Sequence, residues 1–114
     1  MDESILTTIK KLLGIDSSYS AFDQDIIVHI NTTINILYQL GLDSCGDFYI
    51  EDDGATWGDM LESNSILNLV QTYMYLRVKS MFDPANGSVN ESLNRIQQEL
   101  EWRINVMVDP KGFW

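Results

Sequence analysis

Apolar residues recur with a helical period in four stretches of the chain. The first stretch has apolar residues every three to four positions: Ile5, Leu6, Ile9, Leu12 and Leu13. This spacing places them on one face of a helix. Gly14 follows directly, and glycine is the residue that most often ends a helix. The sequence therefore predicts a short amphipathic helix that stops at Gly14.

The second stretch has the same period. Its apolar face is formed by Ile26, Ile27, Ile30, Ile34, Leu37 and Tyr38. Ser20 stands three residues before Asp23, a spacing that resembles a capping box at a helix N-terminus. We therefore expect a second helix that begins near Ser20, ends before Gly41 and turns this face toward the core.

Two longer stretches, at about residues 65–82 and 88–108, predict two further helices. The core face of the first is formed by Ile66, Leu69, Val70, Tyr73, Met74, Val78 and Met81. That of the second is formed by Val89, Leu93, Ile96, Leu100, Ile104 and Met107. Pro84 separates the two helices, because the residue before a proline avoids helical backbone angles. Ser88 and Glu91 predict a capping box at the start of the last helix.

Residues 42–58 interrupt the helical pattern. They contain three glycines, a strand-like run at 48–50 and the turn dipeptide Asp53-Gly54, so they form either a small hairpin or an ordered loop. Thr56 and Asp59 predict a capped helical turn after the loop. The fold class is therefore all-α: a small bundle of about four helices with an irregular or hairpin loop at 42–58 and an extended C-terminal tail at 109–114.

Charge and cysteine usage narrow the functional classes. The chain of 114 residues has 17 acidic and 7 basic side chains and a net charge of -10. This balance disfavours a protein that grips phosphates, because such proteins cluster lysine and arginine. The lone Cys45 allows no intrachain disulfide. Without a signal peptide or a long apolar run, we expect a soluble protein, made in the cytoplasm, with no membrane partner.

The candidate catalytic residues form no recognisable site. His29 is the only histidine, so neither a transition-metal site nor a nucleophile triad can be assembled with Cys45. The acidic run 51–54 fails as a calcium loop, because Met60 stands where an EF-hand needs glutamate. We expect no enzyme, no cofactor and no metal. A carboxylate-pair enzyme is left as a third alternative, since spacing alone does not exclude it.

Several side chains favour contacts with other proteins instead. Tyr75 lies off the core stripe of its helix, and Trp102 stands beside Arg103, a combination typical of interface hot spots. We predict a subunit interface at Tyr75, Arg77, Trp102 and Arg103. The alternatives are that Tyr75 and Trp102 pack against the chain's own core and that Arg77 pairs with acidic neighbours. Two aromatic residues at the end of the tail suit docking into a partner's groove.

Six segments of the chain resemble one known family, the phage head–tail connector (adaptor) proteins, which form the ring beneath the portal of long-tailed bacteriophages. The segments are IKKLLGID at 9–16, FDQDII at 22–27, VQTYMYLRVK at 70–79, MFDP at 81–84, SLNRI at 92–96 and ELEWRIN at 99–105. The resemblance implies a helical bundle without enzymatic activity or cofactor. It also implies a dodecameric ring stacked on the portal, with DNA crossing the channel without specific binding.

The resemblance also implies partners and site residues. The longest helices, at 66–82 and 88–108, would build the ring wall, and the next partner would be a stopper or tail-completion protein. Residues 1–108 would form the connector domain and 109–114 a docking tail in the virion neck, assembled in the host cytoplasm. The residues expected to grip the portal are Val108, Asp109, Pro110, Phe113 and Trp114.

The acidic charge fits two functions. In a connector, an acidic channel wall would let DNA slide without being held. The alternative is a small acidic binding module, such as a DNA-mimicking inhibitor, which is motivated by the seven acidic residues between Asp43 and Glu62. Against this alternative, Glu99 and Glu101 are interspersed with arginines on the last helix.

Overall fold

The computed structural model describes residues 2–61, 64–82 and 87–108, without the side chains of 87–89. Within these ranges the chain forms helices and no strand. They are α1 (Ile5–Leu12), α2 (Asp23–Gln39), α3 (Trp57–Met60), α4 (Leu67–Phe82) and α5 (Gly87–Val108), with short 3-10 helices η1 (Asp43–Cys45) and η2 (Asn64–Ile66). The predicted all-α fold is confirmed, and the four long helices are those that the apolar periodicity indicated.

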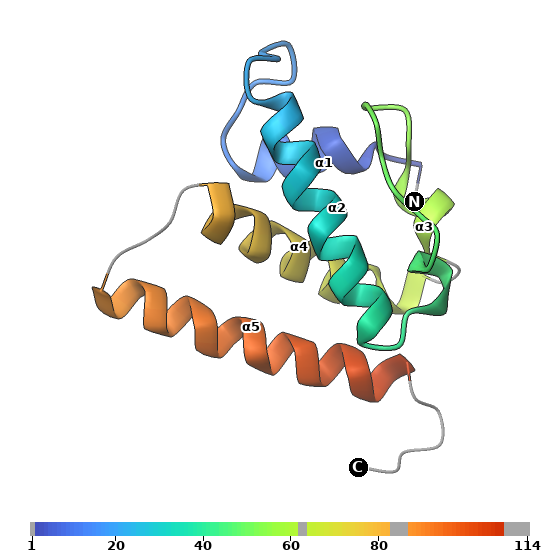
Figure 1. The fold of residues 1–114 in the computed structure, drawn as a ribbon, viewed down its shortest axis with the longest axis vertical. Coiled ribbons are helices and arrows are strands. Elements are labelled where there is room, and N and C mark those ends of the chain that lie inside the picture. The colour runs from blue at the N-terminus through green and yellow to red at the C-terminus, as the bar shows by residue number, and fades with distance from the viewer. Residues whose placement is uncertain (1, 62–63, 83–86, 109–114) are drawn as a thin grey trace.

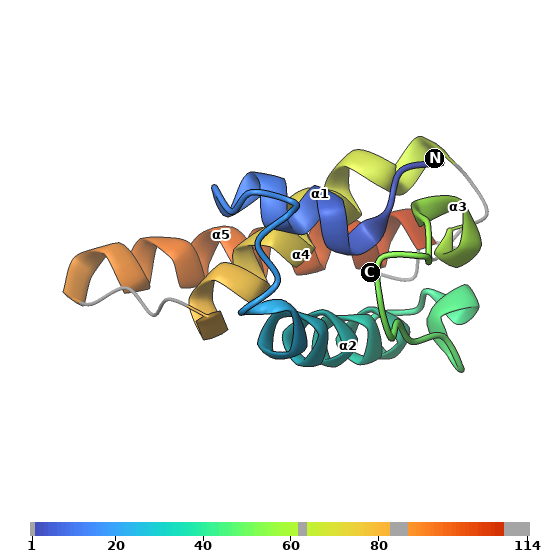
Figure 2. The same ribbon diagram turned by 90° about the horizontal axis from the view of Figure 1, so that it is seen from above.

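Helix α4 is the centre of the bundle. It lies between α2 and α5 and also contacts α1 (Figure 1). Seen from above, α1 and α2 lie on opposite sides of α4 and α5 (Figure 2). Helix α5 forms one edge of the body (Figure 1) and packs mainly against α4. Much of the surface of this long helix is therefore not covered by the chain's own described residues.

The core is formed mainly by isoleucines of α1 and α2 and by the inner face of α4. Its largest fully buried side chains are Ile5, Ile9, Ile26, Ile30, Ile34, Leu37, Trp57, Met60, Val70, Tyr73, Met74 and Ile104. Burying each large apolar side chain contributes roughly 1.5–3 kcal/mol. Among the described side chains of α5, only Ile104 belongs to this set. Helix α5 is thus less firmly anchored by apolar burial than α2 or α4.

Local capping signals set several helix ends. The predicted capping box at α3 is confirmed: Thr56 and Asp59 each bind the other's backbone N–H through their side chains. Gly14 and Gly41 follow α1 and α2 with positive φ angles of 81° and 116°. A Cβ atom at Gly41 would lie 2.7 Å from Val108 Cγ2, so the close approach of α5 to this turn also requires glycine.

The predicted capping box at Ser20 is wrong. Helix α2 begins at Asp23, with Phe22 as its N-cap and no side-chain capping bond. The Asp23 carboxylate is engaged elsewhere, because Lys10 Nζ lies 2.8 Å from its Oδ1 atom. The capping box predicted at Ser88 and the role of Pro84 lie outside the described residues and side chains.

Residues 42–58 form an ordered loop and not a hairpin. Asn31 of α2 holds the loop through Ile50: its Nδ2 donates to Ile50 O at 3.0 Å and its Oδ1 accepts from Ile50 N at 2.8 Å. The loop then pairs with the N-terminal segment, where Ile5 N donates to Ala55 O at 3.0 Å. Because these partners satisfy the backbone, the strand-like run at 48–50 needs no partner strand.

The predicted core stripe of α5 is partly wrong. Ile96 and Met107 are 44% and 47% exposed, whereas Gln97 is 3% exposed. Tyr38, assigned to the core face of α2, is also exposed. In α5 the buried line includes Gln97 because polar groups on α4 satisfy its amide, and a satisfied amide can be buried without a large penalty.

Candidate assembly surfaces

Polar side chains attach α5 to the body. Gln97 Nε2 donates to Ser80 Oγ at 2.7 Å and to Leu76 O at 3.3 Å, and Gln97 Oε1 accepts from Arg77 Nη1 at 3.3 Å. Two more contacts follow at four-residue intervals along α5, from Glu101 and Asn105. This ladder fixes the rotation and register of α5 on α4, because buried hydrogen-bonding groups tolerate little displacement.

The Glu101 and Asn105 contacts reach two different helices. Tyr73 is fully buried, and its hydroxyl donates to Glu101 Oε2 at 2.7 Å. Burial is the main cause that raises the pKa of the Tyr73 hydroxyl, and the hydrogen bond with Glu101 raises it further. Asn105 Nδ2 donates to Leu40 O at 2.7 Å, just past the end of α2. Helix α5 is therefore fastened to α4 and to the end of α2.

The outward side chains of α5 include three large apolar residues. Ile96, Trp102 and Met107 are 44%, 63% and 47% exposed. Eleven residues, or about three helical turns, separate Ile96 from Met107, so both lie on the same flank of the helix. Trp102 lies two residues before the buried Ile104, which places it on the opposite side from the core. We call these three residues the exposed apolar set of α5.

The predicted interface residues divide between the two helices. Tyr75 and Arg77 are partly buried on α4: Lys79 Nζ lies 5.8 Å from the Tyr75 ring centroid, and Arg77 reaches Gln97. Trp102 and Arg103 are exposed on α5, where Arg103 pairs with Glu99 at 2.9 Å. No hydrogen bond or ion pair described here joins the α4 residues to Trp102 or Arg103. The most accessible of the four predicted contacts are therefore on α5.

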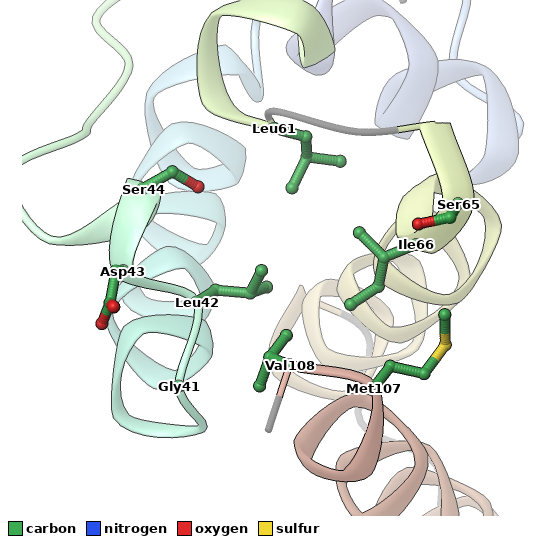
Figure 3. A pocket seen from close by; sticks show the side chains of 9 residues that line it. All are labelled: Gly41, Leu42, Asp43, Ser44, Leu61, Ser65, Ile66, Met107 and Val108. Atoms are coloured by element: carbon green, nitrogen blue, oxygen red, sulfur yellow. The ribbon is translucent and has the colours of Figure 1, made fainter. Parts of the chain in front are cut away.

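The predicted docking tail follows directly on α5. Asp109, Pro110, Phe113 and Trp114 lie outside the described residues. Val108 is half-buried and lines a pocket of about 330 Å³ at the end of the helix. Figure 3 shows the side chains around this pocket: Gly41, Leu42, Asp43, Ser44, Leu61, Ser65, Ile66, Met107 and Val108. Val108, the last described residue, thus lies at the wall of a small, partly apolar pocket.

The acidic loop presents its carboxylates to solvent. Asp43, Asp47 and Asp53 are exposed, and Asp52 Oδ1 accepts a hydrogen bond from Gly54 N at 2.8 Å. Among the described residues, no three His, Cys, Asp or Glu side chains are grouped to hold a metal ion. No described helix has the length and apolar character of a membrane span.

Cys45 is buried beside the pocket, and we predict that its thiol is protected. Burial raises the pKa of the Cys45 thiol to about 11, against an opposing hydrogen bond with Ser44. At pH 8 the thiolate fraction is then about a hundredth of that of a thiol with the ordinary pKa of 9. Iodoacetamide should therefore alkylate the native protein at least about 100-fold more slowly than the urea-unfolded chain.

The pH dependence of the protein's stability provides a second check on the Cys45 thiol. Because the folded pKa is above the unfolded one, the thiol's contribution to stability is present below about pH 9 and is lost as the pH rises through about 11. Equal alkylation rates in the native and unfolded chains at pH 8 would contradict the buried position of Cys45.

One of three comparisons with known proteins gives a match. Neither the curated proteins nor the solved structures give a match. The family model described as phage connector protein matches residues 5–111, which include α1 to α5. This match confirms the resemblance found in the six sequence segments. The chain therefore belongs to the phage connector proteins, a structural family of the bacteriophage virion.

Proposed function

We propose that the chain is an adaptor subunit of the virion neck, which forms a ring under the portal, joins the capsid to the tail and lets DNA pass. The observation that carries this proposal is the family match over residues 5–111. The ring size implied by the resemblance is twelve subunits, and the next partner is a stopper or tail-completion protein.

The exposed apolar set of α5 supports self-association. Trp102 is the largest member of this set and the most exposed, and tryptophan is enriched among the residues that dominate binding at protein interfaces. Helix α5 lies at an edge of the body (Figure 1), where a neighbouring subunit can approach it. A heterologous contact of this kind, repeated by rotation, closes into a ring. Trp102 and Arg103 would be the centre of that contact.

Charge supports the passage of DNA. A protein that holds DNA places lysine or arginine side chains against the phosphates. This chain instead has a net charge of -10. A channel wall that includes exposed carboxylates, such as those of the loop at 42–58, would repel the backbone and keep DNA from sticking. Substrate specificity and catalysis play no part in this function.

The portal contact is assigned to Val108 and the tail. Val108 is placed at the end of α5 beside the pocket, so the tail can extend from the body toward a partner. Deleting Phe113 and Trp114 should leave the far-ultraviolet circular dichroism unchanged, because every residue of α1 to α5 is retained. The same deletion should abolish co-sedimentation of the chain with the purified portal ring of the same phage. Electron microscopy of the sedimented material then shows whether a ring of added density is present.

The outcomes of this experiment separate the proposed function from its alternative. A stacked ring of added density beneath the portal, lost on deletion, is the expected result. Unchanged attachment of the truncated chain would remove the tail from the portal contact but not the family membership. A full-length chain that never binds the portal would favour the acidic binding module, which should be indifferent to the deletion.

A further inference from the structure

We propose that in the free subunit the pocket at the end of α5 binds the chain's own tail, with Phe113 or Trp114 inserted between η1 and η2. The inference rests on the proposed function in one respect only: the portal, as the second binding partner of the tail, is taken from that proposal. Its test uses the isolated subunit, so it can fail independently of portal binding.

The pocket has the chemistry of a site for one aromatic side chain. Its inner wall consists of Leu42, Leu61 and Ile66, which are 8%, 2% and 7% exposed and point toward a common space (Figure 3). Met107 supplies a thioether at the rim, a group that makes favourable contacts with ring edges. Its volume of about 330 Å³ is at the small end of ligand pockets, which suits one ring and not two.

The length and sequence of the tail allow it to reach this pocket. Six residues follow Val108, and six extended residues span at most about 20 Å. Asp109-Pro110-Lys111-Gly112 has the type I turn pattern, with aspartate first, proline second and glycine fourth. In the proposed arrangement, a turn with this sequence pattern would reverse the chain after Val108 and allow an aromatic residue to return to the pocket.

Charge complementarity favours the same arrangement. Lys111 is the only cation between Arg103 and the end of the given sequence, and it lies on the turn. Asp43 is exposed at the pocket rim and opens the acidic stretch of the loop. Among the residues that line the pocket, Asp43 is the only charged one, so an ammonium group on the turn would meet one carboxylate near the rim and no described cation.

Docking in the free subunit would keep one of the two aromatic rings out of water until the portal competes for the tail. The apparent affinity for the portal is then reduced by the fraction of subunits whose tail is free. The pocket and the portal thus compete for one tail, which couples release of the tail to engagement of the correct partner.

The test is nuclear magnetic resonance on the full chain at two concentrations. We expect nuclear Overhauser effects from the ring protons of Phe113 or Trp114 to the methyl groups of Leu42, Leu61 and Ile66. In a Phe113→Ala/Trp114→Ala chain these methyl resonances should move downfield, since the ring current is lost. Methyl resonances that do not move in this double variant would overturn the proposal.

A matched pair of variants tests the pocket side. Met107→Glu places a carboxylate at the rim and should release the tail, with loss of the same effects. Ile96→Glu is the control, because Ile96 is equally exposed on the same flank of α5 but does not line the pocket. Tail release by both variants, or by neither, would overturn the assignment of this pocket.

Mixing labelled and unlabelled chains identifies the occupant. Nuclear Overhauser effects that persist on dilution, and that are absent between differently labelled chains, show a tail bound to its own subunit. Effects between differently labelled chains would mean that the pocket holds the tail of a second copy, which contradicts the proposal for the free subunit.

Discussion

Replacing Lys10 with methionine is expected to lower the free energy of unfolding by about 3 kcal/mol. Lys10 is 2% exposed, and its Nζ donates to Ser17 O at 3.1 Å and Tyr19 O at 2.7 Å and lies 2.8 Å from Asp23 Oδ1. The ammonium group is thus held by two hydrogen bonds to backbone carbonyls and by one ion pair. Methionine keeps the apolar stem but leaves two carbonyls and a carboxylate without their cation. The loss should be at the low end for a buried pair, because Asp23 keeps 26% side-chain exposure.

Urea unfolding of the two adjacent lysine variants measures this effect. Lys11→Met is the matched control, since Lys11 is exposed on the same helix and should change the free energy of unfolding by less than about 0.5 kcal/mol. The urea midpoint should fall for Lys10→Met with an unchanged slope. A midpoint equal to that of Lys11→Met would show that the lysine cluster does not hold the link between α1 and α2.

The link fastened by Lys10 also supports the end of α4. Phe22 lies in this link, and its ring centroid is 5.2 Å from that of Phe82 and 5.6 Å from that of Tyr19. Edge-to-face pairs of this kind add roughly 0.5–1.5 kcal/mol to their apolar burial. One buried ammonium group therefore organises a segment that has no regular structure of its own.

The sequence predicted the features that depend on neighbouring residues. The capping box of Thr56 and Asp59 and the helix ends at Gly14 and Gly41 each involve residues within one helical turn. The role of Lys10 could not be predicted in the same way. A lysine in the last turn of a helix indicates by itself only a favourable interaction with the helix dipole, whereas the partners of Lys10 lie 7 to 13 residues further along the chain.

The core face of α5 shows why apolar periodicity was not sufficient. The periodicity selected Ile96 and Met107, which are exposed, and passed over Gln97, which is buried. One signal was available: Gln97, Glu101 and Asn105 recur every four residues and so share a face. Their partners on α4 and at the end of α2 decide that this polar face turns inward, and those partners are distant in sequence.

The four predicted interface residues differ in exposure, which the sequence alone did not indicate. Trp102 and Arg103 were selected as a hot-spot pair, and both are exposed on α5. Tyr75 and Arg77 were selected with them, but the packing of α4 against α5 leaves these side chains partly buried. The pocket at Val108 is formed by four segments of the chain, so no local pattern could have revealed it.

In the ring that we propose, replacing Trp102 with alanine is expected to weaken the contact between subunits by at least about 30-fold. Trp102 is 63% exposed on the side of α5 that points away from the core. Truncation of an interface hot spot costs about 2 kcal/mol or more, which corresponds to about 30-fold in a dissociation constant. The monomer should keep its stability, since the described core does not include Trp102.

Tyr49→Ala is the matched control, because Tyr49 is also 63% exposed but belongs to the loop after η1. Assembly is measured by co-sedimentation, as the protein concentration at which half of the maximum amount of chain is bound to the portal. Stability is measured by urea unfolding. An equal loss in both variants would mean that exposed aromatic residues in general drive association. Undisturbed assembly of the Trp102→Ala chain would show that the subunit contact is not on this side of α5. The contact would then lie on the flank of Ile96 and Met107 or on α1, and the subunit would have to be oriented differently around the axis of the proposed ring.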